Sequence, residues 1–211
     1  MNELLNRDAV DLAAMIARRE ISAAELMEAT LVRIDEVNPK LNAIVSRIDF
    51  DAAMDMARAA DKGPLKGPMH GLPLAIKDLA DAKGLPTTRG SPAYRDVGPA
   101  PKDDIMVARM RGAGALIIGK TNTPEFGLGS HTYNPVWGAT RNAWDPSKSA
   151  GGSSGGAAVA LTTGMMPIAD GSDMMGSLRN PAGWANIYGY RPSWGRSEEH
   201  TSELQSPCNL V

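Results

Sequence analysis

The sequence predicts an α/β fold on three observations. Helical spacing of apolar residues dominates the first 62 residues, and two short apolar runs typical of buried strands follow at 72–78 and 115–118. A further helical pattern lies between these two runs. Strands that alternate with helices along one chain are typical of the α/β class. The chain has 211 residues, 43% of them hydrophobic, which is enough for one globular domain with a sizeable core.

The segment 1–62 is expected to be a helical lead-in. Ser22 and Glu25 bound a capping box, which predicts that a helix starts here. This helix should end near Asn38–Pro39, because a proline disfavours helix in the residue before it. The other elements expected in this segment are an earlier helix, a strand at 42–45 and a third helix at 52–60. The inner faces of the first two helices should carry Val10, Leu12, Ala13, Ala14, Ile16, Ala17, Leu26, Ala29, Val32 and Ile34.

The segment 63–195 is expected to form the core that carries the chemistry. Its first strand ends in Lys77 and Asp78, and Asp103–Asp104 can cap a helix that runs to Arg111. A loop rich in Gly, Ser, Asn and Pro spans 121–154, and loops this long in compact domains are usually functional. The remaining elements expected are the strand at 115–118, a small-residue helix at 155–163 and a short strand at 166–170.

Composition and charge exclude several classes of partner. The net charge is -2 and the pI is about 5.9, and no basic stripe suited to nucleic acid occurs. No apolar run approaches the roughly 20 residues that a membrane span needs, and the N-terminus lacks the pattern of a signal peptide. A single cysteine, Cys208, excludes an internal disulfide framework. We therefore expect a soluble cytoplasmic protein with no nucleic-acid or membrane partner.

Residues Gly114–Thr121 fit the Walker A pattern of nucleotide-binding proteins. The variable positions of that motif wrap a phosphate as a loop, whereas here they read Ala-Leu-Ile-Ile, which is typical of a buried strand. The motif also needs a helix that begins at its lysine, and Pro124 disfavours helix at Thr123. We expect a strand at this place, and a P-loop nucleotide-binding module is the weakest functional alternative.

Three separated elements carry residues suited to nucleophilic catalysis. Lys77 ends an apolar strand, Gly151–Gly156 is a dense Gly/Ser run, and Asp170–Ala182 contains a serine that follows a glycine. Each has an ordinary explanation on its own: a lysine that reaches solvent, a flexible linker, and a polar turn with an Asp–Arg pair. Together they indicate a base, a glycine-rich backbone that can approach a ligand closely, and a nucleophile loop.

These elements resemble the amidase signature family. The resemblance covers roughly residues 8–195. The matching segments are Gly71–Asp78, Gly119–Phe126, Gly138–Asp145, Gly151–Gly156 and Asp173–Ala182. The resemblance implies a large mixed β-sheet flanked by helices. It also implies that this fold is incomplete here, because the C-terminal half of the family's typical length is missing.

The resemblance implies a Ser-cis-Ser-Lys triad and no cofactor or metal. Ser177 would be the nucleophile, Ser153 the proton relay, and Lys77 the general base, kept neutral by burial. The oxyanion would be bound by the backbone amides of Met174, Met175, Gly176 and Ser177. Asp173, Arg179 and Ser154 would support the loop. Many members of the family have Gly where this chain has Met175, and Met tolerates positive φ poorly.

The function implied is hydrolysis of a small-molecule carboxylic amide through an acyl-enzyme, with this chain alone expected to be unstable and inactive. One alternative is a glutaminase similar to the one in glutamyl/aspartyl-tRNA amidotransferase, which depends on a partner protein. Another is a non-catalytic amidase-like scaffold. Leu79–Asp81 and Ser130–Asn134 favour a stand-alone amidase over the amidotransferase. The resemblance also allows a homodimer of the full-length parent.

The last residues, 196–211, share no pattern with the preceding sequence. Arg196–Ser206 resembles the in-frame translation of a short-read sequencing adapter. We expect 196–211 to be a non-native tail, in which His200 and Cys208 have no function.

Overall fold

The computed structural model describes residues 3–193 and the backbone of residues 208–210. Its elements in chain order are η1 (Glu3–Asn6), α1 (Ala9–Ala17), α2 (Ala23–Leu41), β1 (Ile44–Arg47), α3 (Phe50–Lys62), β2 (Pro73–Lys77), η2 (Pro92–Tyr94), α4 (Ile105–Gly112), β3 (Leu116–Thr121), η3 (Glu125–Gly127), β4 (Tyr133–Asn134), β5 (Gly138–Ala139), α5 (Gly155–Thr162), β6 (Asp170–Ser172), α6 (Arg179–Ala185) and β7 (Cys208–Leu210). The α/β class predicted from the sequence is confirmed.

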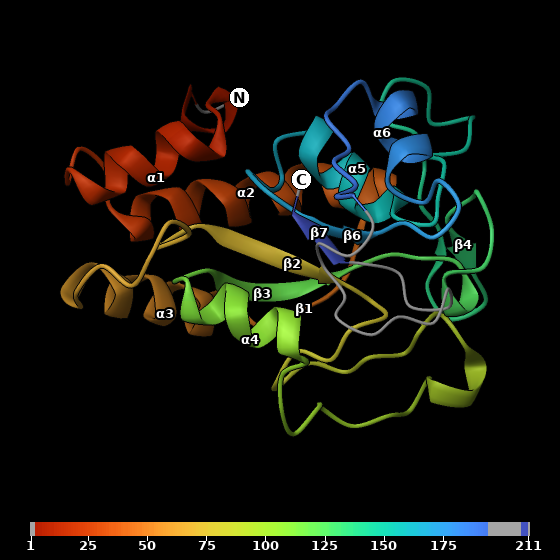
Figure 1. The fold of residues 1–211 in the computed structure, drawn as a ribbon, viewed down its shortest axis with the longest axis horizontal. Coiled ribbons are helices and arrows are strands. Elements are labelled where there is room, and N and C mark those ends of the chain that lie inside the picture. Colours follow the sequence, from red (N-terminus) through yellow and green to blue (C-terminus); the bar gives the residue numbers. More distant parts are fainter. Residues whose placement is uncertain (1–2, 194–207, 211) are drawn as a thin grey trace.

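The central sheet is mixed and has the strand order β1-β3-β2. β2 runs parallel to β3, and β1 runs antiparallel to it. Figure 1 shows these strands through the middle of the molecule, with α1 and α3 to the left, α5 and α6 at the upper right, and the β6–β7 pair near the centre just above β2. Because β1 belongs to the segment 1–62, that segment contributes a strand as well as helices to the fold.

The two faces of the sheet pack against different helices. Ala75 of β2 and Ile118 of β3 lie in a core shared with α2, α3 and α5. Their neighbours Leu74 and Ile117 lie in a second core with α4. Successive side chains of a strand point to opposite faces, which explains this division. The same alternation places Lys77 on the face of Ala75, toward α5.

The capping box that opens α2 is confirmed. The Ser22 hydroxyl accepts a hydrogen bond from the Glu25 amide at 3.0 Å, and the Glu25 carboxylate accepts one from the Ser22 amide at 2.7 Å. The predicted end of this helix near Pro39 is wrong, because α2 continues to Leu41. Its last turn is closed by Asn42, which is left-handed and donates its amide to the Asn38 carbonyl at 2.8 Å.

The inner faces of the first two helices are narrower than the sequence predicts. Leu12, Ile16, Leu26, Ala29 and Ile34 are buried as expected. Two of the expected inner residues instead face outward, since Val10 is 80% exposed and Val32 is 58% exposed. Ala17 is also exposed.

The acidic pair before α4 has a different role from the one predicted. The helix does begin after Asp104, but that side chain makes no cap hydrogen bond. Asp104 instead accepts the Asp81 amide at 2.8 Å, and Asp103 accepts the Lys83 amide at 2.7 Å and pairs with Arg111. The pair therefore fastens the loop after β2 to the start of α4.

Three strands are displaced from their predicted positions. β1 starts at Ile44 rather than residue 42, because Asn42 caps the preceding helix. β3 extends to Thr121, beyond the predicted end at 118. The strand expected at 166–170 is wrong: residues 166–169 are irregular and β6 covers Asp170–Ser172.

The expected tail lies mostly outside the described residues. Positions 196–207, including His200, and position 211 are not described. The backbone of Cys208–Leu210 pairs antiparallel with β6. Within the described part of the chain, no helix is long and apolar enough to cross a membrane.

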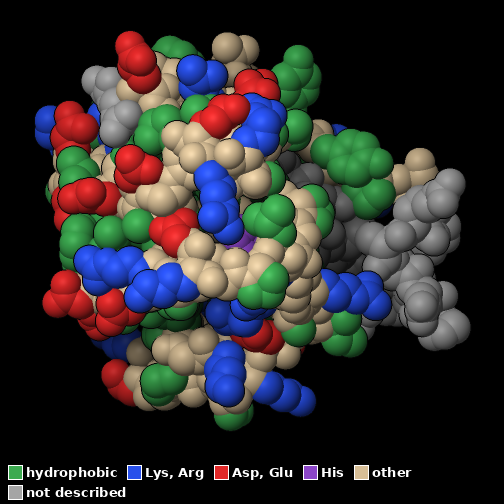
Figure 2. Space-filling view, turned by 90° about the vertical axis from the view of Figure 1, so that its left-hand side faces the viewer, with side chains coloured by type: hydrophobic (Ala, Val, Ile, Leu, Met, Phe, Trp, Pro, Cys, Tyr) green, Lys and Arg blue, Asp and Glu red, His purple; other side chains and the backbone are tan. Residues whose placement is uncertain are grey.

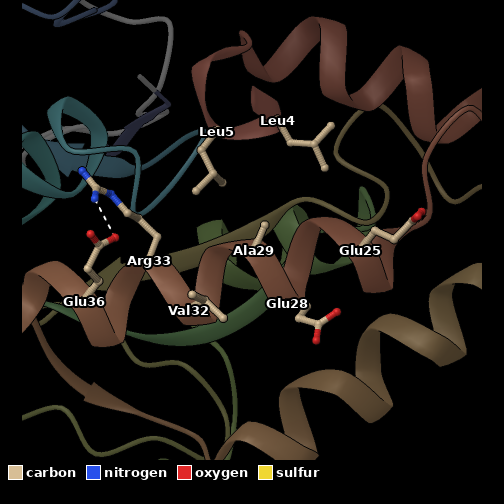
Figure 3. A pocket seen from close by; sticks show the side chains of 8 residues that line it. All are labelled: Leu4, Leu5, Glu25, Glu28, Ala29, Val32, Arg33 and Glu36. Atoms are coloured by element: carbon tan, nitrogen blue, oxygen red, sulfur yellow. Dashed lines mark hydrogen bonds and ion pairs between the residues drawn. The ribbon is translucent and has the colours of Figure 1, made fainter. Parts of the chain in front are cut away.

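The described surface carries side chains of both charges and includes a groove near the N-terminal helices. In the face drawn in Figure 2, basic and acidic side chains are interspersed. A groove of about 370 Å³ lies between η1 and α2, and an Arg33–Glu36 ion pair of 2.8 Å stands on it (Figure 3). None of the site residues predicted from the sequence lines this groove.

Replacing Ser22 by Ala should lower the free energy of unfolding by about 1 kcal/mol, because the hydrogen bonds of the Ser22 hydroxyl with the Glu25 amide and carboxylate are lost. Urea unfolding measures this change. The matched control is Asp8→Ala, since Asp8 is the N-cap of α1 but makes no cap hydrogen bond. Equal effects of the two substitutions would contradict the role assigned to the capping box.

Candidate active site

Lys77 ends β2 in a fully enclosed position, with 2% of its surface exposed. Its amine donates hydrogen bonds to three serine hydroxyls: Ser153 at 2.8 Å, Ser154 at 2.9 Å and Ser172 at 2.9 Å. The strand alternation that turns Lys77 toward α5 explains why it meets Ser153 and Ser154, which immediately precede that helix. The structure thus brings together two members of the predicted triad, Lys77 and Ser153.

The Gly/Ser run before α5 is an ordered connection rather than a linker. The Gly152–Ser153 peptide bond is cis, as the resemblance implies. The Thr132 hydroxyl donates to the Gly151 carbonyl at 2.8 Å and accepts the Gly155 amide at 3.1 Å. A side chain at Gly152 would collide with the backbone of His131. This glycine is therefore needed for packing within the protein, not for the approach of a ligand as the sequence suggested.

Asp173 is the centre of the loop that carries Ser177. Its buried carboxylate accepts the amides of Gly176 at 2.6 Å, Leu178 at 3.1 Å and Arg179 at 3.2 Å, and both oxygens also accept from the Arg179 guanidinium at 2.9 Å. Burial by itself raises the pKa of Asp173, but the hydrogen bonds from Arg179 and the amides outweigh it and hold the pKa well below the usual range. This one carboxylate therefore holds the backbone of residues 176–179 in a defined conformation.

Ser177 is half-buried and is joined to the lysine site through backbone. Its carbonyl accepts the Ser154 amide at 3.0 Å, which ties the loop that carries Ser177 to the Gly/Ser run. Among residues 3–193, the Ser177 hydroxyl makes no hydrogen bond, so the side-chain link from Ser177 to Ser153 is not formed in this state. The structure thus bonds the third member of the predicted triad to Ser154, the neighbour of Ser153, without a side-chain hydrogen bond between Ser177 and Ser153.

The four backbone amides predicted to bind the oxyanion differ in whether they already donate a hydrogen bond within the protein. The Gly176 amide is already used by Asp173, which corrects its assignment as a donor. Within the described part of the chain, the amides of Met174, Met175 and Ser177 donate to no acceptor. The left-handed backbone of this loop falls on Gly176, with φ of 111°, and not on Met175. Met175 is therefore compatible with the loop, and 82% of its surface is exposed.

Two residues at the site were not singled out by the sequence reasoning. Ser172 supplies the third hydroxyl to Lys77, and the buried carboxylate of Asp170 accepts the Lys77 amide at 2.8 Å. Burial raises the pKa of Asp170 to about 6, against the lowering effects of the Lys77 amide and the charges of Lys77 and Lys120. A sequence signal for them exists. Asp170 and Ser172 are polar residues two positions apart, just before Asp173, so in a strand they would point to the same side.

Comparison with known proteins identifies the family of this site. A family model described as Amidase matches residues 25–203. The chain belongs to the amidase family. Solved structures of the family share its fold: a bacterial aryl acylamidase of the amidase signature enzymes superposes with a TM-score of 0.84 and 36% identity, over 91% of this chain and 40% of that one.

Characterised amidase relatives fall into more than one functional group. One glutamyl-tRNA(Gln) amidotransferase subunit, from Acidothermus cellulolyticus, is 46% identical over 199 residues, which are 92% of this chain and 39% of the relative. An acylamidase from Rhodococcus erythropolis is 44% identical over 191 residues, which are 89% of this chain and 40% of the relative. The chain thus spans about two fifths of the length of these relatives.

The Walker A string of this amidase chain is a strand. Lys120 lies in β3, is 0% exposed, and donates to the Ala80 carbonyl at 2.7 Å and the Thr87 hydroxyl at 2.8 Å. It also pairs with Asp78 at 3.5 Å. Burial lowers the pKa of Lys120, while the charge of Asp78 acts in the opposite direction. A lysine committed to these partners has no route to a bound phosphate. In the described residues, no group of three or more His, Cys, Asp or Glu side chains could hold a metal ion.

Replacing Asp173 by Asn should lower the free energy of unfolding by about 2–3 kcal/mol at pH 7, because charge-assisted hydrogen bonds to amides and Arg179 are weakened. The folded pKa lies below the unfolded value of about 3.9, so this stabilisation is present above pH 4 and is lost as the pH falls. Urea unfolding from pH 7 to pH 3 should therefore show the gap to wild type narrowing below about pH 4.

The control for this measurement is Asp55→Asn, which removes an exposed carboxylate paired with Arg58. It should change stability by less than about 0.5 kcal/mol at every pH. A gap for Asp173→Asn that stays constant down to pH 3 would contradict the role assigned to the Asp173 charge.

Proposed function

We propose that this chain carries the catalytic core of an enzyme that hydrolyses a carboxylic amide C–N bond. Ser177 acts as the nucleophile, Ser153 as the proton relay and Lys77 as the general base. The observation that supports this most is the buried hydrogen bond of 2.8 Å between the Lys77 amine and the Ser153 hydroxyl, with the Ser177 loop bonded to the adjacent Ser154 amide. Membership of the amidase family supports the reaction class.

The surroundings of the lysine suit a base that changes its protonation state. A charged lysine amine has three N–H donors, which match the three hydroxyls of Ser153, Ser154 and Ser172. A neutral amine has two N–H donors and one lone pair, and each hydroxyl can donate as well as accept. The same three partners therefore satisfy both forms, and burial disfavours the charged one.

Acylation begins when the Ser177 oxygen attacks the amide carbonyl. The Ser177 proton passes to Ser153, and the proton of Ser153 passes to Lys77. The C–O bond between Ser177 and the substrate thus forms as the Lys77 amine becomes positively charged. This step requires the Ser177 and Ser153 hydroxyls to come within hydrogen-bond reach, and catalytic hydrogen bonds often tighten only in the substrate complex. The oxyanion accepts from the amides of Met174, Met175 and Ser177, each worth about 3 kcal/mol in the transition state.

The tetrahedral intermediate then collapses. The C–N bond breaks, and the proton held by Lys77 returns through Ser153 to the departing nitrogen, which leaves as an amine or ammonia. Water next attacks the ester on Ser177 and gives a proton to the same relay. The C–O bond to Ser177 breaks, Ser177 regains a proton, and the carboxylic acid is released.

A second candidate function is a glutaminase that passes ammonia to a partner protein. Its support is the 46% identity to the glutamyl-tRNA(Gln) amidotransferase subunit from Acidothermus cellulolyticus. The same three residues would perform the reaction, with glutamine as substrate. Assaying ammonia release from glutamine, with and without the other subunits of such a complex, separates this candidate from an amidase that acts alone on small-molecule amides.

Replacing Ser177 by Ala should reduce amide hydrolysis by the full-length protein to the background rate, because no acyl-enzyme can form. Release of amine or ammonia from a panel of simple amides and glutamine measures this, and a thermal melt verifies that the variant is folded. Ser147→Ala serves as the control, since Ser147 is exposed and, among the described residues, its side chain bonds to Asp145 alone. Turnover by folded Ser177→Ala would refute the nucleophile assignment.

Replacing Lys77 by Ala should cost more activity at neutral pH than at high pH, where hydroxide can partly replace the missing base. The kcat/KM of variant and wild type, compared from pH 6 to pH 10, should differ by a factor that shrinks as the pH rises. Lys148→Ala removes an exposed lysine and should leave the profile unchanged. A Lys77→Ala defect of equal size at every pH would argue for a structural role only.

A further inference from the structure

Four buried ionisable side chains gather where β2 and β3 end. Lys77 is the last residue of β2 and Asp78 follows it, while Lys120 lies in β3. Asp170 lies in β6, which contacts β2. Lys120 and Asp78 form one ion pair of 3.5 Å. Asp170 is the remaining acid of the group, and the mechanism proposed above leaves it without a role.

β6 accepts hydrogen bonds from both the backbone amide and the side-chain amine of Lys77. Asp170 and Ser172 are two positions apart and so share one face of the strand. Ser172 accepts from the side-chain amine at 2.9 Å, and Asp170 accepts from the backbone amide at 2.8 Å. With 1% of its surface exposed, Asp170 has little water to screen its charge from the lysine.

We propose that Asp170 is a positioning residue for Lys77, the general base. The Asp170 carboxylate anchors the Lys77 backbone, and its negative charge stabilises the protonated Lys77 amine. The proposal rests on the function proposed for Lys77. It gives this carboxylate two effects on the reaction. An unprotonated Lys77 beside a negative charge is a stronger base, and a higher pH is needed to reach that unprotonated form.

The electrostatics of the group agree with this geometry. Burial raises the pKa of Asp170 to about 6, against the Lys77 amide and the charges of Lys77 and Lys120, so the carboxyl is ionised above that pH. In the described residues, the other negative charge of the group is Asp78, which Lys120 contacts. The three hydroxyls that accept from the Lys77 amine are uncharged.

The test is the pH profile of kcat/KM for Asp170→Asn in the full-length protein. Asn keeps an oxygen that can accept the Lys77 amide but removes the charge. The acidic limb of the profile should move to lower pH by about one unit or more, because Lys77 loses its proton more readily without the neighbouring carboxylate. A purely structural role for Asp170 would lower the rate at every pH and leave the limb in place.

The control variant is Asp145→Asn, which removes an equal charge from an exposed position and should not move the limb. Asp170→Ser is a second neutral variant, and thermal melts report whether each variant is folded. An unmoved limb in a folded neutral variant overturns the proposal.

These outcomes are separable from failure of the proposed function. A wild type that hydrolyses no amide, or a Ser177→Ala variant that still does, refutes the function itself. A wild type whose activity depends on Ser177, together with an unmoved limb in Asp170→Asn, refutes only the role of Asp170.

Discussion

Much of the described fold serves to keep one amine out of water. A buried lysine is tolerated only when its donors are satisfied, and here three hydroxyls satisfy them: Ser153, Ser154 and Ser172. The first two precede α5 and the third lies in β6, so two separate segments must be held against the end of β2. The division of the sheet into two packed faces achieves this, because the face that carries Ala75 also carries α5.

Two ionic contacts near Lys77 in the chain or the fold restrict the surrounding backbone. Lys120 pairs inside the fold with Asp78, the residue that follows Lys77 in the sequence. Asp173 accepts hydrogen bonds from three amides and from the Arg179 guanidinium in the residues that follow it. Breaking a buried contact of this kind leaves a charge without compensation, which is far more costly than the contact itself is favourable. Both contacts therefore act mainly by excluding other arrangements of the loops.

The sequence predicted those features that depend on local chemistry. The capping box of Ser22 and Glu25 involves neighbours three positions apart, and the strand that ends in Lys77 is a continuous apolar run. Features that depend on distant partners escaped prediction. α2 passes Pro39 because Asn42 closes its last turn, and Asp170 became a candidate only once β6 was seen beside β2. The closeness of Lys77 to Ser153 was predicted by resemblance, since no local rule joins residues so far apart.

The contrast between Gly152 and Met175 divides the site into two zones for directed evolution. At Gly152 any side chain would enter the space of the His131 backbone, so a library that varies this position would consist mostly of misfolded members. Met175 has an ordinary backbone conformation, and among the described residues it is 82% exposed. Saturation of Met175 and of the exposed Met174 would therefore vary the surface of the Ser177 loop while the packing beneath stays unaltered.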